Sequence, residues 1–327
     1  MIQQALKLVG KKKLEWVTTR VPALEADQVL IETIATAISV GAELPQYDET
    51  DLTDSSPDYP RKVGYESYGR VVDKGEDVTT LHVGDRVIAF YGQQTYGIVS
   101  AQKAFYVPPE VDYKTALLAI LSCDAAKGVR KLVPSSTDSV IVSGLGTMGL
   151  LATYYLRNYY GVKKIDAIEP DSNRRELAYR FGVEQVYAPN EVKDSHYHYG
   201  MECSARNEGF MNLQQAVMPN GSICILSDGN QEELVLLPQF YEKELYIVGS
   251  SDGWDYREHF KWFFGASWQT SYIQEIFELD IDQSSLIATF ERLSAHVINP
   301  IKIAVTYKKK KHQLMTEKDG SICLIIK

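Results

Sequence analysis

The chain has few cysteines, no long apolar run and no concentration of positive charge, and each absence excludes a class of protein. Its four cysteines are scattered without a C-x-x-C pair, so they provide no disulfide framework and no zinc knuckle. No apolar stretch is long enough to span a bilayer, and the opening residues, MIQQALKLVGKKK, do not resemble a signal peptide. We therefore expect a cytoplasmic protein with reduced thiols and no membrane partner.

The net charge and the length of the chain narrow the class of protein further. A net charge of −9, without a basic stripe, argues against nucleic acid and anionic membranes as partners. The chain has 327 residues, of which 45% are hydrophobic, and this is enough for two domains with separate cores. The composition therefore predicts a soluble protein of two domains.

One stretch combines a strand, a glycine-rich turn, a helix and a second strand. The apolar run 140–142 predicts a buried parallel strand, and the sequence GLGTMG follows it at 144–149. A helix is expected from Met148 to about Tyr160, with Gly161 as its stop, and a second strand over 164–168. This order of elements is the context in which a G-x-G-x-x-G motif binds a dinucleotide.

The three glycines of this motif have separate physical roles. Gly144 permits the tight turn, Gly146 lets the backbone approach a pyrophosphate, and Gly149 allows close packing of helix and strand. The helix that begins at Thr147 and Met148 offers free N–H groups and the positive end of its dipole to the same pyrophosphate. These five residues are therefore the candidate phosphate-binding loop of the cofactor.

An acidic residue at the end of the second strand indicates which nicotinamide cofactor is bound. Glu169 can accept hydrogen bonds from the ribose hydroxyls of the adenosine, and it would repel a 2′-phosphate. This favours NAD(H) over NADP(H). Arg174 and Arg175, in the next predicted helix, could weaken that preference, and Arg174 is included among the candidate cofactor contacts.

The elements change character twice along the chain. Residues 1–115 are predicted to be mostly β, with a hairpin around Gly10, long strand patterns and a polar loop over 47–60. Strands and helices alternate over 116–255, which is typical of a parallel α/β sheet. Residues 256–327 add an aromatic helix, further helices and a final pair of strands, IKIAVTY and SICLIIK.

Several motifs in order resemble the medium-chain dehydrogenase/reductase superfamily of the zinc-type alcohol dehydrogenases. They are YPRKVGYESYGRVV at 59–72, GDRV at 84–87, the glycine loop with Glu169, and MECS at 201–204. The resemblance implies an α/β fold in which a doubly wound, parallel Rossmann sheet is inserted in a mostly β, GroES-like catalytic domain. It also implies a homodimer formed through the cofactor domain, by the strand at 245–250.

The sequence departs from this family where the family binds zinc. The positions of the usual ligands correspond to Val40, Tyr65 and Ile120, and the region 84–108, where a structural zinc would be held, contains no cysteine. The S-x-G-x-E-L pattern at 39–44 resembles a zinc-lacking branch that includes bacteriochlorophyllide dehydrogenases. No zinc is therefore expected, although a replacement metal site on Glu43, Glu66 and Cys123 is the alternative.

Four side chains are candidates for the chemistry that zinc would otherwise perform. Tyr65 takes the place of the ligand histidine and could donate a hydrogen bond to a developing alkoxide, or it could simply fill the core. Ser39 could line the pocket or cap a turn, and Glu66 could act in catalysis or form a structural ion pair. Asp124 could contact the nicotinamide or relay a proton, or it could pair with Lys127 on a solvated helix face.

These features predict a zinc-independent, NAD(H)-dependent oxidoreductase that interconverts a secondary alcohol and a ketone. The substrate would be a small carbonyl or alcohol bound between the two domains. One alternative keeps the fold and reduces a quinone or an activated alkene. Another is a non-catalytic sensor that binds NAD(H).

Overall fold

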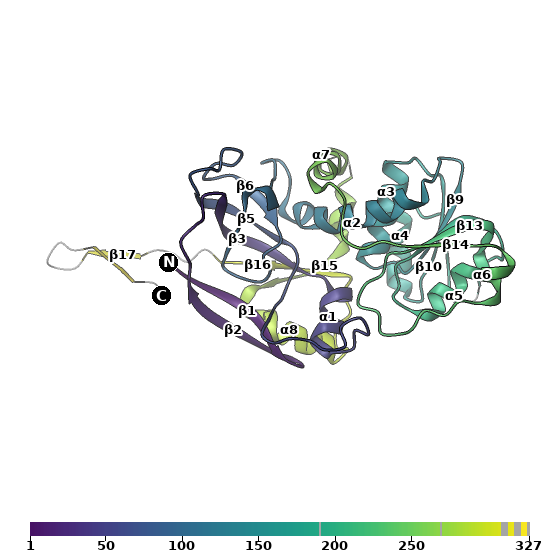
Figure 1. Cartoon of the computed structure of the whole chain (residues 1–327), viewed down its shortest axis with the longest axis horizontal. Helices are drawn as coiled ribbons and strands as arrows, with labels where there is room; N and C mark the ends of the chain where they lie inside the picture. The colour runs from purple at the N-terminus through teal and green to yellow at the C-terminus, as the bar shows by residue number, and fades with distance from the viewer. Residues whose placement is uncertain (190, 269, 309–312, 317–321, 326–327) are drawn as a thin grey trace.

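The computed structural model describes all residues except 190, 269, 309–312, 317–321 and 326–327, and it describes side chains up to residue 308. Figure 1 shows a β-rich body and an α/β body, with helix α2 (Tyr113–Leu132) between them. None of the described helices combines the length and the apolarity needed to cross a membrane.

The α/β body is built on a six-stranded parallel sheet. Its strands follow the order β11-β10-β9-β12-β13-β14. Their bounds are β9 (Ser139–Ser143), β10 (Lys164–Ile168), β11 (Gln185–Tyr187), β12 (Tyr197–Glu202), β13 (Val217–Ile225) and β14 (Tyr246–Gly249). This is the doubly wound order 3-2-1-4-5-6, which reverses direction between β9 and β12. Ligands of such sheets bind at the carboxyl ends of the strands at that reversal.

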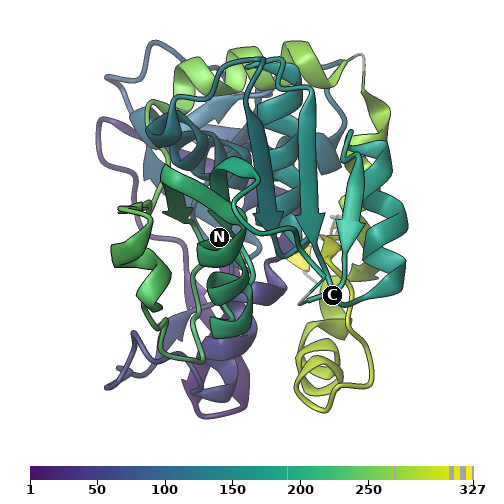
Figure 2. The same ribbon diagram turned by 90° about the vertical axis from the view of Figure 1, so that its right-hand side faces the viewer.

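Helices flank the strands of this sheet in the view of Figure 2. They are α3 (Thr147–Asn158), α4 (Ser172–Arg180), α5 (Asn207–Ala216) and the short α6 (Pro238–Glu242). Because helices cover both faces, strand β9 is buried along its whole length, as its run of β-branched residues predicts. The expected strand over 164–168 is confirmed. The helix expected to run to about Tyr160 ends at Asn158 with Tyr159 as its C-cap, two residues before Gly161, which has a φ of +67°.

The β-rich body contains two sheets. A small sheet has the order β2-β1-β4, and the larger one has the order β15-β16-β3-β5-β6-β8, with β7 also paired to β3. The small sheet comprises β1 (Ile2–Gly10), β2 (Lys13–Arg20) and β4 (Arg61–Lys62). The larger one comprises β3 (Gln28–Ile38), β5 (Ser67–Lys74), β6 (Arg86–Ala89), β7 (Tyr96–Ser100), β8 (Ala104–Tyr106), β15 (Phe277–Asp282) and β16 (Lys302–Thr306).

The chain leaves the larger sheet after β8 and returns to it at β15, so the parallel sheet is an insertion in the β-rich body. This confirms the predicted fold class. Helix α2 joins the two bodies, and a single apolar cluster contains side chains from both, such as Ala35 and Tyr68 on one side and Val140 on the other. Burial of a continuous apolar cluster across the junction stabilises the relative position of the two bodies.

The structure corrects two expectations about local elements. The turn and the start of the polar loop predicted over 39–60 form a helix, α1 (Val40–Asp48), even though Pro45 lies inside it. Tyr47, predicted to begin a surface loop, is buried against Phe290 of helix α8 (Leu286–Ser294), with ring centroids 5.3 Å apart. Packing against α8 therefore outweighs the local turn preference of the segment.

The final strands also pair differently from the prediction. Strand β16 lies between β15 and β3, whereas β18 (Ile322–Ile325) pairs with β17 (Gln313–Thr316). The aromatic helix is α7 (Tyr256–Ser267), and it packs against α2 through buried His259, whose Nε2 lies 3.0 Å from the Ser122 hydroxyl. The short 3₁₀ segments are η1 (Ala101–Lys103), η2 (Ser271–Ile276) and η3 (Gln283–Ser285).

Candidate active site and cofactor site

The glycine loop has the shape that its sequence predicts. Gly144 has a φ of +87°, in the left-handed region that favours glycine. A Cβ on Gly149 would lie 1.9 Å from the carbonyl oxygen of Gly144, so only glycine lets α3 approach the loop. Gly146 precedes the first residue of α3, and a Cβ there would meet nothing within 4 Å. The loop therefore leaves open space beside the free N–H groups of Thr147 and Met148, which fits a pyrophosphate.

Glu169 lies beside this loop at the end of β10. Its Oε2 accepts a hydrogen bond from the Leu145 N–H at 2.7 Å, and its Oε1 accepts one from the Asp171 N–H at 3.0 Å. The carboxylate thus braces the glycine loop while standing where a ribose would be bound in this fold. The residues present therefore fit a dinucleotide.

The two arginines of α4 have different partners. Arg175 donates to the backbone carbonyls of Glu169 and Pro170, whereas Arg174 donates to the Asn299 side chain at 3.2 Å. Thr147 reaches the same segment, since its hydroxyl donates to the Ile301 carbonyl at 3.3 Å. The glycine loop and α4 are therefore held against the start of β16, which belongs to the larger sheet of the β-rich body.

A buried ion pair lies at the start of β16, in the larger sheet of the β-rich body. The ammonium group of Lys302 donates to Glu66 Oε1 and to Ser39 Oγ, both at 2.7 Å. The Ser39 hydroxyl in turn donates to Glu66 Oε1 at 2.9 Å. Lys302 and Glu66 are fully buried, and Ser39 is 5% exposed. We call Lys302, Glu66 and Ser39 the lysine cluster.

Strand pairing explains why these three residues meet. Ser39 directly follows β3, Glu66 directly precedes β5, and Lys302 begins β16. Because β3 is antiparallel to both neighbours, the end of β3 lies beside the starts of β5 and β16. Glu66 is thus a structural ion-pair partner, one of its two predicted readings. Sequence reasoning missed Lys302, although a lone lysine in an otherwise apolar strand is a usable signal.

A second carboxyl group lies next to the lysine cluster. Glu43, in the first turn of α1, accepts a hydrogen bond from the Ser39 N–H at 2.8 Å through Oε1. Its Oε2 is buried and has no hydrogen-bond partner among the described residues. Burial raises the pKa of Glu43 to about 8, and the negative charge of Glu66 acts in the same direction. Glu43 is therefore largely protonated at neutral pH.

Tyr65 lies between this region and the cofactor domain. Its hydroxyl oxygen accepts a hydrogen bond from the Gln46 side chain at 2.5 Å. Burial raises the pKa of Tyr65 above its usual value, and the negative charge of Asp228 contributes in the same direction. Asp228 belongs to the loop between β13 and β14, on the cofactor domain. The phenol is thus neutral at physiological pH and half-buried, with its own proton available to donate.

Asp124 lies on α2, and its hydrogen-bond donor is an uncharged tyrosine hydroxyl. The Tyr256 hydroxyl donates to Asp124 Oδ1 at 2.8 Å, and the Gly253 N–H donates to the same hydroxyl at 2.7 Å. Burial raises the pKa of Asp124 to about 7, and the charges of Asp252 and Glu66 add to the shift. Its predicted partner Lys127 instead donates to the Asp252 carbonyl. Asp124 can therefore exchange a proton near neutral pH.

The positions that would hold zinc in the family do not carry ligands. Val40 begins α1, Ile120 is buried in α2, and the phenol of Tyr65 accepts from Gln46. Over the described part of the chain, no group of three or more His, Cys, Asp and Glu residues is arranged to hold a metal. The proposed replacement ligands have other partners, since Cys123 donates to the Trp254 carbonyl. These residues do not fit a zinc ion, and we derive no step through one.

Comparisons with known proteins agree with this geometry. Residues 25–108 match the model of the alcohol dehydrogenase GroES-like domain. The chain is 29% identical over 221 residues to L-threonine 3-dehydrogenase of Caldanaerobacter subterraneus subsp. tengcongensis, and the match covers 58% of this chain and 62% of that protein. The chain thus spans somewhat under two thirds of this relative's length.

Solved structures match over nearly the whole chain. The 2R,3R-butanediol dehydrogenase of Bacillus subtilis is 20% identical, with a TM-score of 0.79, and the match covers 93% of this chain and 99% of that one. The alcohol dehydrogenase RspB of Escherichia coli CFT073, complexed with NADH, is 17% identical, with a TM-score of 0.77 and coverage of 93% and 99%. At these identities the structures establish the shared fold.

The fold and its glycine loop define a two-body architecture in which a parallel sheet with a dinucleotide-type turn is inserted in a GroES-like β body. The GroES-like match and the threonine dehydrogenase relative support placement in the medium-chain dehydrogenase/reductase family, of the alcohol dehydrogenase type.

Proposed function

We propose that the protein is a zinc-independent, NAD(H)-dependent oxidoreductase that interconverts a secondary alcohol and a ketone. The observation that carries this proposal is a neutral tyrosine with a free proton, Tyr65, at the position of a family zinc ligand. The glycine motif of the cofactor loop is also intact, and burial raises the pKa of Asp124 to about 7. When bound, the nicotinamide supplies or accepts the hydride.

Tyr65 is assigned the role that zinc has in the metal-dependent members. Reduction of a ketone places negative charge on its oxygen, and a hydrogen-bond donor in a partly buried site stabilises that charge. Gln46 donates to the Tyr65 oxygen and so fixes the direction of the remaining O–H bond. Because Tyr65 is a poor acid, it donates a hydrogen bond in the ground state and passes its proton only to an alkoxide.

Asp124 is assigned the exchange of protons with solvent. It is half-buried, and its pKa of about 7 lets both protonation states exist under working conditions. Ser39 and Glu66 are assigned a positioning role, because the lysine cluster is closed to solvent and its charges are paired. Their contribution is to hold Tyr65, the neighbour of Glu66 along the chain.

The cofactor preference is assigned from Glu169. Its carboxylate stands at the ribose position, and the nearby Arg174 is engaged with Asn299. A 2′-phosphate would meet the Glu169 charge, so the proposal is NAD(H), held by Gly144, Gly146, Thr147, Met148 and Gly149. Homodimerisation is proposed through β14, an edge strand whose Tyr246 is 62% exposed. Light scattering on the purified protein tests this assembly.

The first experiment measures oxidation of NADH, with NADPH in parallel, by metal-analysed protein and a panel of ketones, quinones and enones. Ketone turnover with NADH and without stoichiometric zinc supports the proposal. Turnover confined to quinones or enones assigns the other reaction class. Binding of NADH without turnover of any compound favours a sensor.

The second experiment replaces Tyr65 by phenylalanine. Loss of a transition-state donor should lower kcat by roughly 100-fold with little change in the NADH dissociation constant. Tyr179→Phe, an exposed tyrosine of α4, is the matched control and should retain full activity. Unchanged turnover in Tyr65→Phe would remove Tyr65 from the mechanism.

A further inference from the structure

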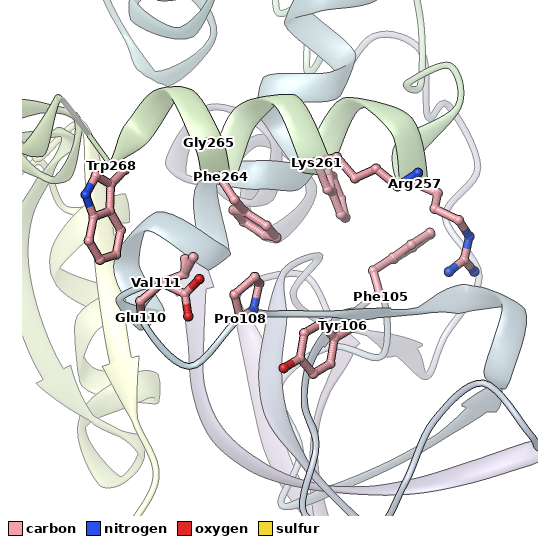
Figure 3. A pocket seen from close by; sticks show the side chains of 11 residues that line it. Phe105, Tyr106, Pro108, Glu110, Val111, Arg257, Lys261, Phe264, Gly265 and Trp268 are labelled. Atoms are coloured by element: carbon pink, nitrogen blue, oxygen red, sulfur yellow. The ribbon is translucent and has the colours of Figure 1, made fainter.

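A groove separate from the proposed active site lies between α7 and the segment 105–111, which leads from β8 toward α2 (Figure 3). Its volume is about 550 Å³, within the range of sites for small molecules. Phe105, Phe260, Phe264 and Val111 form its apolar lining, and Trp268, which is 67% exposed, stands at one end. Phe260, Phe264 and Val111 are largely buried, whereas Tyr106 and Trp268 are exposed and Phe105 is half-buried. Exposed aromatic side chains gathered along a groove are typical of a binding surface.

Charges at the edge of the groove are asymmetric. Arg257 and Lys261 lie one helical turn apart on α7, at the end away from Trp268 (Figure 3). The guanidinium of Arg257 lies 5.6 Å from the centroid of the Phe105 ring, and it forms no ion pair with any described residue. Lys261 pairs with Glu258 at 3.2 Å, but both side chains are largely exposed. Surface pairs of this kind are weak and exchange partners readily.

Among the residues that line the groove, the single acidic side chain is Glu110, and it lies away from the two cationic groups. Glu110 stands nearer to Val111 and Trp268 than to Arg257 (Figure 3). A ligand anion is therefore repelled from the Glu110 end and attracted to the Arg257 end. This sets both the sign of the ligand charge and its orientation.

We infer that this groove binds a small amphipathic monocarboxylate, with its carboxylate at Arg257 and Lys261 and its apolar body against the accessible rings of the aromatic lining. Arginine is suited to this role because its planar fork can donate two parallel hydrogen bonds to a carboxylate. The aromatic lining supplies affinity through burial of apolar surface, which is independent of the reaction in the active site.

The groove is connected to Asp124 through Tyr256. The Tyr256 ring packs on Phe105 and Phe260, with centroids 6.0 Å and 5.8 Å away. Its hydroxyl donates to Asp124 Oδ1. A ligand that orders the two phenylalanines therefore acts on the partner of Asp124. This part rests on the proposed function, which assigns proton exchange in the active site to Asp124, and it predicts a change in the affinity for NADH.

The binding site is tested by calorimetric titration of the full-length protein with 2-naphthoate and, as a neutral analogue of the same shape, 2-naphthalenemethanol. The carboxylate should bind roughly tenfold more tightly than the alcohol. Arg257→Gln should remove that difference and leave the alcohol unaffected, whereas Arg20→Gln, a surface control on β2, should change neither. Equal binding of the two compounds, or full affinity in Arg257→Gln, would overturn the inference.

A second variant tests the location by filling the groove. A side chain at Gly265 would meet nothing within 4 Å of its Cβ, so Gly265→Leu should fold and occupy the space that the ligand needs. Both compounds should then bind at least tenfold more weakly. Retained affinity in Gly265→Leu would place the ligand elsewhere.

The link to Asp124 has its own measurement, which does not depend on turnover. Saturating 2-naphthoate should change the NADH dissociation constant severalfold, and Tyr256→Phe should abolish that change while it leaves 2-naphthoate binding intact. An unchanged NADH dissociation constant in the wild-type protein would refute the link. Because 2-naphthoate binding is measured without substrate, its result stands whether or not the protein reduces ketones.

Discussion

Two acidic residues that are candidates for the active site, Glu66 and Asp124, have opposite surroundings. Glu66 is fully buried and is paired with the ammonium of Lys302. Asp124 is half-buried, and the hydroxyl of Tyr256 is its hydrogen-bond partner. Burial raises the pKa of Asp124 to about 7, and the hydrogen bond from the Tyr256 hydroxyl offsets only part of that effect. The first arrangement supports structure, and the second permits proton transfer.

Removal of the lysine should produce the largest effect on stability. Lys302→Met leaves Glu66 as an uncompensated buried charge, and we expect the free energy of unfolding to fall by about 3–5 kcal/mol. Urea denaturation measures this change. The double variant Lys302→Met/Glu66→Gln should recover much of the loss, because no isolated charge remains. Exposed Lys308→Met is the control, and a loss of similar size there would refute this account of the cluster.

Glu43 extends the comparison to a carboxyl that has no cation bonded to it. Its folded pKa of about 8 exceeds the reference value of 4.5, so the folded state binds more protons between these pH values. Stability therefore falls as the pH rises from about 4.5 to 8 and stays low above this range. Glu43→Gln should stabilise the protein by roughly 2–4 kcal/mol above pH 8 and by nothing near pH 4.

Thermal unfolding of Glu43→Gln and the wild type, measured from pH 4 to pH 9, tests this expectation. Glu49→Gln, at the partly exposed end of α1, is the matched control and should show no such pH dependence. A constant difference between Glu43→Gln and wild type across the range would show that Glu43 does not titrate as described.

Ionisation of Asp124 should also lower the stability of the folded protein, but by less than ionisation of Glu43, because part of the Asp124 side chain is exposed. Its folded pKa of about 7 lies above the reference value of 3.8, so its cost to stability develops between these values. Asp124→Asn should stabilise the protein by about 1–2 kcal/mol above pH 7. Urea titrations at pH 4.5 and pH 8 measure the effect. Equal stabilisation at both pH values would contradict it.

Asp124→Asn also tests whether Asp124, and not Glu66, exchanges the catalytic proton. If Asp124 exchanges the proton, the pH profile of kcat for ketone reduction should show an apparent pKa near 7 that Asp124→Asn removes. Glu66→Gln should lower activity through misplacement of Tyr65 while it leaves that pKa in the profile. A profile that keeps its inflection in Asp124→Asn would assign the proton exchange to another group.

The local geometry of the glycine loop was predictable from the sequence, and the buried contacts of Glu66 were not. Gly144, Gly149 and Glu169 act within one strand–turn–helix–strand unit, so their spacing along the chain carries their geometry. Lys302 lies 236 positions from Glu66, and no local pattern connects the two. Helix α1 was missed for the same reason, since Tyr47 is buried by α8, from the far end of the chain.

The sequence alone determined the α/β class, the insertion of the parallel sheet in a β-rich body and the shape of the glycine-rich turn. Hydrophobic periodicity, glycine spacing and turn chemistry are local properties, and such properties can be recognised from the amino-acid sequence. Only the tertiary structure decided which acid is paired and which can titrate. Ionisation depends on burial and on neighbouring charges within a few ångströms, and folding brings those neighbours from strands and helices far apart in the sequence.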